Sequence, residues 1–390
     1  MARLPNRPFV GEGPEPSAAN ARAMAVPRCL DPRCTLLLLP VIAMAGSYSG
    51  AAPFYVDKTD LLAYLDEEGA RREVRSCEDW AIRRGHILAN MQAVMGLLPE
   101  EAPDGPPVVS VSEEHETRRW TRRHLTYEVA ADDHVPAFLF LPKGRRGPRP
   151  AMLCLHQTIE FGKGEPAGLD GSPDLHYARE LAERGYVTLA PDYPNFGEYQ
   201  LDVYARGFVS ATMKGIVNHR RAIDLLESLP EVDPARIGVI GHSLGGHNSL
   251  FVAAFDQRLK VVVTSCGFNA FPKYYGGDLT GWSHQGYMPR IADLYGMDPR
   301  QMPFDFPEVL AAIAPRGVFV NAPLRDDNFE VSGVYDCLDA ARPVYELLGA
   351  RDRLRAVHPD CGHGFPREAR EAAYEFIDRM LRRTEESRDD

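Results

Sequence analysis

From residue 151 onward, short apolar runs alternate with longer runs in which apolar positions recur every three or four residues. The short runs predict strands buried on both faces of a sheet, and the longer runs predict helices that cover those faces. Repeated strand–helix units favour an α/β fold with a mostly parallel sheet and helices on both faces. The predicted strands are 151–156, 186–190, 236–240, 260–265, 317–321 and 353–358, and the predicted helices are 174–184, 208–229, 248–255, 333–348 and 366–382.

Three other segments have patterns of their own. Residues 57–98 place apolar side chains at spacings of three and four, which predicts a helical extension within 46–117. Residues 118–141 alternate in polarity and predict an antiparallel strand pair that makes the sheet mixed. Residues 266–314 interrupt the strand–helix series with prolines and aromatic side chains. We expect them to form a small cap inserted in a catalytic domain of 118–390.

The first 45 residues resemble a targeting segment. Residues before Met24 are rich in Pro, Gly and Ala, which predicts disorder. The apolar run 35–45 follows two arginines and ends in Ala43-Met44-Ala45, which resembles a signal-peptide cleavage site. Translation from Met24 would make 24–45 an export signal, and we expect a periplasmic or extracellular location rather than a cytoplasmic one. The alternative is a disordered extension that carries an apolar patch.

The composition excludes several classes of protein. Of 390 residues, 44% are hydrophobic and 25% are charged, as in ordinary globular proteins. The net charge of -11 argues against a nucleic-acid partner, and no segment is long enough for a stable membrane span. The seven cysteines include no C-x-x-C pair, and the histidines show no zinc spacing. We therefore expect no metal, while the oligomeric state stays open.

The residues Gly241-His242-Ser243-Leu244-Gly245 join a predicted strand to a predicted helix. They fit the pattern G-x-S-x-G, and in this context the pattern predicts a nucleophile elbow with Ser243 at its tip. A side chain at either glycine would collide with the neighbouring strand or helix. The turn would aim the helix N-terminus, and with it the backbone N–H of Leu244, at a developing oxyanion.

Two loops after later strands supply the partners that a serine nucleophile needs. A serine hydroxyl is activated by a base, normally a histidine oriented by a carboxylate, in the chain order serine, acid, histidine. His363 follows the strand 353–358 between two glycines and is the predicted base. Asp326 and Asp327 follow the strand 317–321. Asp327 is preferred as the acid because it lies further into the loop.

The loops at the carboxyl edge of the predicted sheet supply further candidates. A second oxyanion donor should be a backbone N–H after the first central strand, and Thr158 is favoured over Gln157. Trp282 in the predicted cap would offer an aromatic face to a sugar ring or an aromatic acyl group. Tyr193 and Glu198 would line the same pocket, since ligands lie at this edge in open α/β folds. The alternative is that Trp282 packs inside the cap and that the other two cap the next helix.

These residues resemble those of the α/β-hydrolases, and more narrowly those of the dienelactone-hydrolase and acetyl-xylan-esterase-like branch. The resemblance covers residues 118–384 and departs at His156-Gln157, where many relatives have His-Gly. It implies an α/β-hydrolase fold and hydrolysis of an ester without a metal or cofactor. The segments that carry the resemblance are 184–187, 190–193, 241–246, 326–328 and 361–363.

The predicted function is a serine esterase that cleaves a carboxylic ester through an acyl-enzyme, with Ser243, His363 and Asp327 as the triad. The substrate would be a small-molecule ester or an acyl ester on a carbohydrate. Alternatives with the same residues are a serine peptidase of the prolyl-oligopeptidase kind and a lactone hydrolase of the dienelactone type. A non-catalytic binding protein on the same fold is a further alternative, since fold does not fix function.

Overall fold

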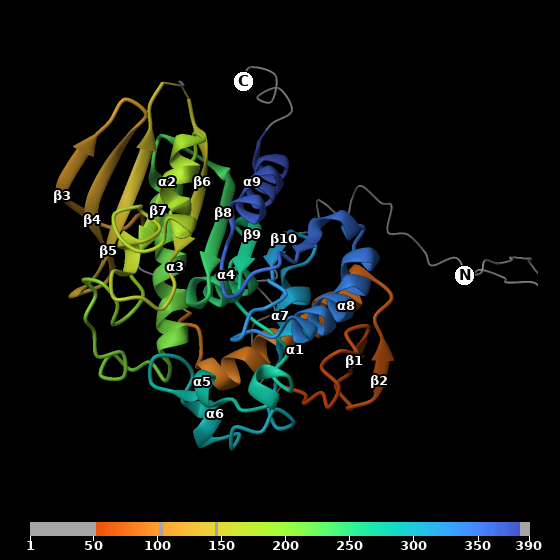
Figure 1. The fold of residues 1–390 in the computed structure, drawn as a ribbon. Coiled ribbons are helices and arrows are strands. Elements are labelled where there is room, and N and C mark those ends of the chain that lie inside the picture. Colours follow the sequence, from red (N-terminus) through yellow and green to blue (C-terminus); the bar gives the residue numbers. More distant parts are fainter. Residues whose placement is uncertain (1–51, 101–103, 145–146, 383–390) are drawn as a thin grey trace, which may run out of the picture.

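The computed structural model describes residues 52–100, 104–144 and 147–382, and a nine-stranded sheet forms its centre (Figure 1). The strands lie in the order β11-β10-β9-β8-β6-β7-β5-β4-β3. Their bounds are β3 (Val109–Glu116), β4 (Trp120–Ala130), β5 (Asp133–Pro142), β6 (Arg149–Leu155), β7 (Val187–Pro191), β8 (Val232–His242), β9 (Leu259–Ser265), β10 (Gly317–Asn321) and β11 (Leu354–Val357).

The sheet is mixed and mostly parallel, as predicted. All pairings from β7 through β6, β8, β9 and β10 to β11 are parallel, whereas β5 pairs antiparallel with β7 and with β4, and β4 with β3. Leu153 of β6 pairs with Val239 of β8, and both side chains are fully buried. Continuous burial of this kind explains why the central strands are apolar throughout rather than alternating.

Helices cover both faces of the sheet, which confirms the predicted fold class. Side chains of α2 and α9 pack on one face, and side chains of α1, α3, α4, α7 and α8 belong to the larger apolar core on the other. The short helices α5 and α6 belong to residues 266–314. The helices are α1 (Cys77–Met95), α2 (Tyr177–Glu183), α3 (Ala211–Ser228), α4 (Leu244–Phe255), α5 (Thr280–Ser283), α6 (Arg290–Asp293), α7 (Phe306–Ile313), α8 (Val331–Leu347) and α9 (Arg367–Leu381).

The prediction of an entirely helical segment over 57–98 is wrong in its first part. The hairpin of β1 (Ala63–Leu65) and β2 (Arg71–Glu73) precedes α1. In the connecting turn Gly69 has a φ of 77°, a conformation that glycine adopts without the steric clash of a Cβ. Ser76 then starts α1 with a capping box closed by Asp79. The predicted extension 46–117 also includes β3, which pairs with β4, so the sheet begins before residue 118.

The N-terminal extension is bound to the main domain through a buried ion pair. Arg83 of α1 donates from Nη2 to Glu308 Oε1 of α7 at 2.6 Å, and neither side chain is exposed. The Arg83 guanidinium also lies 3.5 Å from the centre of the Tyr55 ring. Glu308 additionally accepts the backbone N–H of Asp305 and so closes the capping box of α7. The pair therefore joins α1 to the last helix of 266–314.

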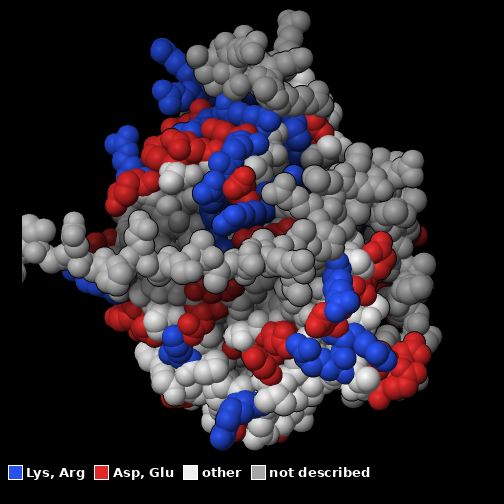
Figure 2. Space-filling model, turned by 90° about the vertical axis from the view of Figure 1, so that its right-hand side faces the viewer, with Lys and Arg blue, Asp and Glu red and all other residues white. Residues whose placement is uncertain are grey.

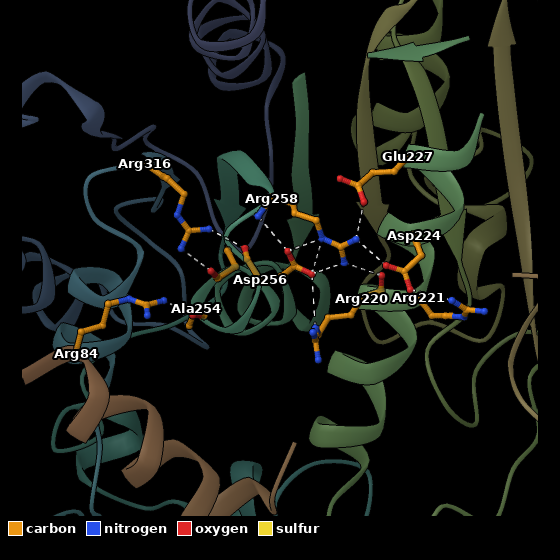
Figure 3. A network of polar contacts seen from close by, with 10 residues as sticks. Arg84, Arg220, Arg221, Asp224, Glu227, Ala254, Asp256, Arg258 and Arg316 are labelled. Atoms are coloured by element: carbon orange, nitrogen blue, oxygen red, sulfur yellow. Dashed lines mark hydrogen bonds and ion pairs between the residues drawn. The ribbon is translucent and has the colours of Figure 1, made fainter. Parts of the chain in front are cut away.

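Two arginines hold the C-terminal end of α4 (Figure 3). Arg84 Nη2 donates to the carbonyl of Ala254 at 2.6 Å, and Arg316 Nη2 donates to the carbonyl of Ala253 at 2.6 Å. Carbonyl dipoles leave partial negative charge at a helix C-terminus, so cations stabilise this end. The helix that begins beside Ser243 is thus fixed at its far end.

Arg258 extends this network to α3 (Figure 3). Its Nη1 lies 2.6 Å from Asp224 and 2.7 Å from Glu227, both on α3, and its Nη2 lies 2.6 Å from Asp256 at the end of α4. Burial lowers the pKa of Arg258, but the hydrogen bonds and charges of these carboxylates outweigh it and raise the pKa above its usual value. The network holds the C-terminal ends of α3 and α4 together, at the end of α4 that is remote from Ser243.

Residues 1–45, with the predicted export signal 24–45, lie outside the described residues, so disorder and export stay predictions. Among the described residues, no helix has the length and apolar character needed to cross a membrane. On the face drawn in Figure 2, visible Lys and Arg side chains lie next to Asp and Glu side chains. Neighbouring opposite charges are typical of a solvated surface without a large patch of a single charge sign.

Replacing Glu308 with alanine should lower the free energy of unfolding by about 3–5 kcal/mol, because Arg83 would keep its charge without its buried partner. Urea denaturation of both proteins measures this difference. Asp339→Ala is the matched control, since Asp339 lies 3.9 Å from Arg342 with a side chain that is 78% exposed. A Glu308→Ala protein as stable as the control would contradict the assignment of the buried pair as a docking contact.

Candidate active site

Ser243 lies in the tight turn between β8 and α4. Its φ of 52° and ψ of -115° are strained for a residue with a side chain. A Cβ at Gly241 would collide with the backbone of Gly245, and a Cβ at Gly245 would collide with the carbonyl of Leu155 at the end of β6. The N–H of Ser243 donates to Ser265 O at 2.8 Å, which fixes the turn to β9. The predicted elbow is therefore present, with the serine side chain partly exposed.

His363 lies in the loop between β11 and α9 and is bound to Asp326. Its Nδ1 lies 2.9 Å from Oδ1 and 3.0 Å from Oδ2 of Asp326. Asp326 Oδ1 also accepts the backbone N–H of Asn328 at 2.9 Å and of Phe329 at 3.1 Å. Burial raises the pKa of Asp326, but these hydrogen bonds and the charge of His363 lower it below its usual value overall. An ionised Asp326 accepts a hydrogen bond from the protonated Nδ1 of His363. In this tautomer Nε2 carries a free lone pair and can accept a proton.

The preference for Asp327 as the partner of His363 is wrong. The Asp326 side chain is 1% exposed and faces the imidazole, whereas Asp327 is exposed. The backbone N–H groups of the two residues after Asp327 turn toward the carboxylate of Asp326 and cage it. Position along the loop is therefore a poor guide, because the loop turns back on itself at this point.

The His363 loop is anchored directly beside the elbow. The ring of His242, the residue before Ser243, meets the ring of His363 edge to face with 4.9 Å between centroids. Asn321 Nδ2 at the end of β10 donates to Gly364 O at 2.9 Å and to Ser265 Oγ at 2.8 Å. Within the described residues, His363 forms no hydrogen bond with the Ser243 hydroxyl. Such contacts are often long without substrate and shorten when it binds.

The loop after β6 is held by His156, a residue that the sequence analysis left without a role. The N–H of Tyr193 donates to His156 Nε2 at 2.9 Å, so Nε2 carries no proton and Nδ1 does. Nδ1 donates to the carbonyl of Gln157 at 2.6 Å. In a trans peptide the next N–H points away from that carbonyl, so the N–H of Thr158 faces away from His156. The exposed Thr158 can thus present its N–H to solvent beside the elbow.

Gln157 and Leu244 complete the surroundings of this loop. The side chain of Gln157 donates from Nε2 to both oxygens of the buried Glu165, at 3.0 and 2.9 Å. Leu244 is the first residue of α4, and the first N–H groups of a helix have no partner within it. The side chain of Thr158 lies 3.3 Å from the hydroxyl of Tyr287 in the segment 266–314.

Two of the predicted substrate contacts are wrong for the conformation that the structure describes. Trp282 is 2% exposed and packs against the rings of Phe306 and His247, so it belongs to the core under the cap. Tyr193 is also 2% exposed, and its hydroxyl donates to Gly286 O at 3.2 Å. Trp282 thus fits the alternative of packing inside the cap, whereas Tyr193 is buried against the segment 266–314.

Glu198 is the one of the three predicted contacts that reaches solvent. Its side chain is 57% exposed and its Oε2 lies 2.8 Å from His124 Nε2 and 3.1 Å from Lys163 Nζ. Lys163 in turn donates to the buried Asp192 at 2.8 Å. These contacts join the loops after β6 and β7 to β4, so a structural function accounts for Glu198.

The described residues bring three potential metal ligands together at the base of the site. One ligand atom each of Cys266, Asp326 and His363 lies within 4.8 Å of the others. Asp326 and His363 are already bound to each other, and Cys266 Sγ donates to Gly364 O at 3.4 Å. An ion held here would have to break the His363–Asp326 hydrogen bond. The donor set therefore fits a hydrogen-bonded site better than a metal centre.

Comparison of the sequence with known proteins identifies one family and several relatives. A family model described as "Alpha/beta hydrolase family" matches residues 164–375. "Putative hydrolase YtaP" of Bacillus subtilis is 27% identical over 302 residues, which cover 74% of this chain and 96% of that protein. "4-O-methyl-glucuronoyl methylesterase 1" of Wolfiporia cocos is 25% identical over 387 residues, which cover 89% of this chain and 88% of that protein.

Solved structures show the same fold. A glucuronoyl esterase from Solibacter usitatus superposes with a TM-score of 0.66 at 20% identity, covering 84% of this chain and 98% of the other. Acetyl xylan esterase 1 from a Thermoanaerobacterium species superposes with a TM-score of 0.53 at 18% identity, covering 75% of this chain and 98% of the other. At these identities the likeness establishes the fold and leaves activity to other arguments.

Buried histidines around the site predict that stability falls in acid. Burial lowers the pKa of His219, His242 and His247 to about 3, against about 6.5 in an unfolded chain. Between these values the unfolded state binds more protons than the folded state, so the free energy of unfolding decreases as pH falls below about 6.5. Each such histidine contributes a slope of up to about 1.4 kcal/mol per pH unit.

Urea denaturation at pH 7, 6 and 5 tests this expectation. His219→Gln should reduce the slope by one histidine's share, whatever its effect on stability at pH 7. His134→Gln is the control, because His134 is exposed on β5 and should leave the slope unchanged. Equal slopes in the parent and His219→Gln proteins would show that His219 takes up its proton in the folded state.

Proposed function

The chain belongs to the alpha/beta hydrolase family, and on this basis we propose that it is a serine esterase that cleaves carboxylic esters through an acyl-enzyme. The observation that carries the proposal is the hydrogen bond between His363 and the buried Asp326, formed beside the strained turn of Ser243. The esterase names of the relatives agree with the predicted enzyme class, a carboxylic ester hydrolase. This family needs no cofactor in the proposed reaction, since the side chains of the protein supply the nucleophile and the base.

In the first half of the reaction, Ser243 Oγ attacks the ester carbonyl while His363 Nε2 accepts its proton. Asp326 keeps the other proton on Nδ1 and stabilises the imidazolium that forms. His363 then protonates the departing alcohol, which leaves an acyl group on Ser243. In the second half, water attacks the acyl-enzyme while His363 accepts a proton from it, and His363 then returns this proton to Ser243 Oγ as the acid product leaves.

The negative charge on the carbonyl oxygen would be held by two backbone N–H groups. One belongs to Leu244 at the N-terminus of α4, where the helix dipole also favours negative charge. The other belongs to Thr158, whose peptide plane is oriented by the hydrogen bond from His156 to Gln157 O. His156 is therefore proposed as a positioning residue. This arrangement uses Gln157 in place of the more common glycine without loss of a donor, because the donor is a backbone group.

We propose an ester borne by a carbohydrate as the substrate. Two kinds of relative support this class: one is named for a methyl ester of a glucuronic acid unit, and the other for acetyl groups on xylan. In the first kind the sugar is the acyl part, and in the second it is the alcohol part. The match to the Wolfiporia cocos protein extends over most of both chains, so we place uronate esters first.

Replacing Ser243 with alanine should lower the rate of p-nitrophenyl acetate hydrolysis at least about 10³-fold and abolish labelling by a fluorophosphonate. Ser283→Ala in α5 is the control and should keep both. An ester panel of methyl glucuronate, acetylated xylose and simple lactones then separates the substrate classes, and an aminoacyl-p-nitroanilide tests the peptidase alternative. Undiminished ester hydrolysis by Ser243→Ala would rule out the proposed mechanism.

The choice of acid is tested by a matched pair of substitutions. Asp326→Asn should reduce kcat by about 10³–10⁴-fold, because an amide cannot hold the imidazole in the required tautomer or stabilise its positive charge. Asp327→Asn changes an exposed neighbour in the same loop and should stay within about twofold of the parent. A larger loss for Asp327→Asn than for Asp326→Asn in steady-state kinetics would reverse the assignment.

A further inference from the structure

Tyr275 has an unusual backbone and an unusual exposure. Its φ of 44° and ψ of 39° put a bulky side chain in the left-handed region, where steric clashes disfavour every residue with a Cβ. Its side chain is nevertheless largely in solvent, because 61% of the residue is exposed. The local strain is thus not compensated by burial of the ring. A strained residue that keeps an aromatic ring in water is more typical of a binding site than of a core.

The ring of Tyr275 is fixed by its neighbours. Its hydroxyl donates to Asn328 Oδ1 at 3.3 Å, and its ring meets the ring of Tyr274 edge to face with 4.9 Å between centroids. Tyr274 is itself 6% exposed and anchored in the core. A ring held in this way loses little further freedom when a ligand binds.

The same contacts connect Tyr275 to the loop that carries Asp326. The side chain of Asn328 accepts the hydrogen bond from the Tyr275 hydroxyl. The backbone N–H of Asn328 donates to Asp326, the partner of His363. A second route runs through rings: Tyr274 lies 5.8 Å from Phe329, and Phe329 lies 6.0 Å from His363. Tyr275 is therefore linked to the imidazole of His363 by two routes, each of which passes through two residues.

We propose that Tyr275 and Asn328 form an outer sugar-binding subsite, which rests on the proposed esterase function and extends it. The Tyr275 ring stacks against the apolar C–H face of a sugar ring next to the esterified unit. Because Asn328 Oδ1 accepts from the tyrosine, its Nδ2 is left to donate to a sugar hydroxyl. An exposed aromatic face with polar groups at its edge suits a carbohydrate better than a wholly apolar group, which a dry pocket would bind. The enzyme would accordingly favour an oligosaccharide ester over a monosaccharide ester.

Steady-state kinetics of Tyr275→Ala and Tyr275→Phe test the subsite. With methyl glucuronate joined to a xylo-oligosaccharide, Tyr275→Ala should raise KM by about tenfold, whereas Tyr275→Phe keeps the ring and should stay close to the parent. With p-nitrophenyl acetate, which has no sugar, both variants should match the parent. Tyr335→Ala is the control, because Tyr335 is a 39% exposed tyrosine on α8 whose ring packs on the ring of His358.

A binding measurement separates this inference from the esterase proposal. Titration calorimetry of Ser243→Ala with an unesterified xylo-oligosaccharide should give measurable binding that Ser243→Ala/Tyr275→Ala loses. A parent protein that hydrolyses p-nitrophenyl acetate but shows equal KM for the oligosaccharide ester with and without Tyr275 overturns the subsite alone. A similar rise in KM of Tyr275→Ala for a benzyl ester without a sugar also overturns it, in favour of an aromatic ligand. A parent protein without any esterase activity, and without labelling at Ser243, overturns the proposed function instead.

Discussion

The close approach of α4 to the end of β6 is the constraint on which the rest of the site depends. Gly245 packs so tightly on the carbonyl of Leu155 that no side chain fits between them, and Gly241 packs as tightly on Gly245. This contact forces the strained φ of Ser243 and sets the direction in which α4 starts. The loops after β6, β10 and β11 then need only reach the same edge of the sheet. In a parallel sheet they do so without further design, because all carboxyl ends lie on one side.

Much of this architecture could be predicted from the sequence. The short apolar runs from residue 151 onward correspond to strands within a few residues, and the order of serine, acid loop and histidine loop matches the structure. The match to the family over 164–375 confirms the inferred resemblance to the α/β-hydrolases. These features can be predicted because they depend on neighbouring residues: fully buried strands are continuous apolar runs, and the elbow requires glycines next to the serine. The helical spacing in 57–76 misled for the same reason: local spacing cannot show that a turn at Gly69 pairs two short strands instead.

Other features depend on contacts between distant segments, and the sequence does not contain them in readable form. Asp326 and Asp327 are neighbours of equal chemistry, and only the fold of the loop decides which carboxylate meets His363. Trp282 is aromatic in a segment near the site, but the packing of Phe306 and His247 around it decides that it is buried. Tyr275 is one of several aromatic residues in the same segment, and the sequence does not set it apart. Its strained backbone and its exposure are visible only in the structure.

The Arg83–Glu308 pair has a consequence for how the chain reaches its native state. Its two members are separated by 225 positions in sequence, so during synthesis α1 leaves the ribosome long before α7 exists. Closing so long a loop costs conformational entropy, although this cost grows only slowly with the length of the loop. Until then the guanidinium of Arg83 stays hydrated, and α1 can have at most a provisional place. The extension at the front of the chain can therefore form this contact only after α7 has been synthesised.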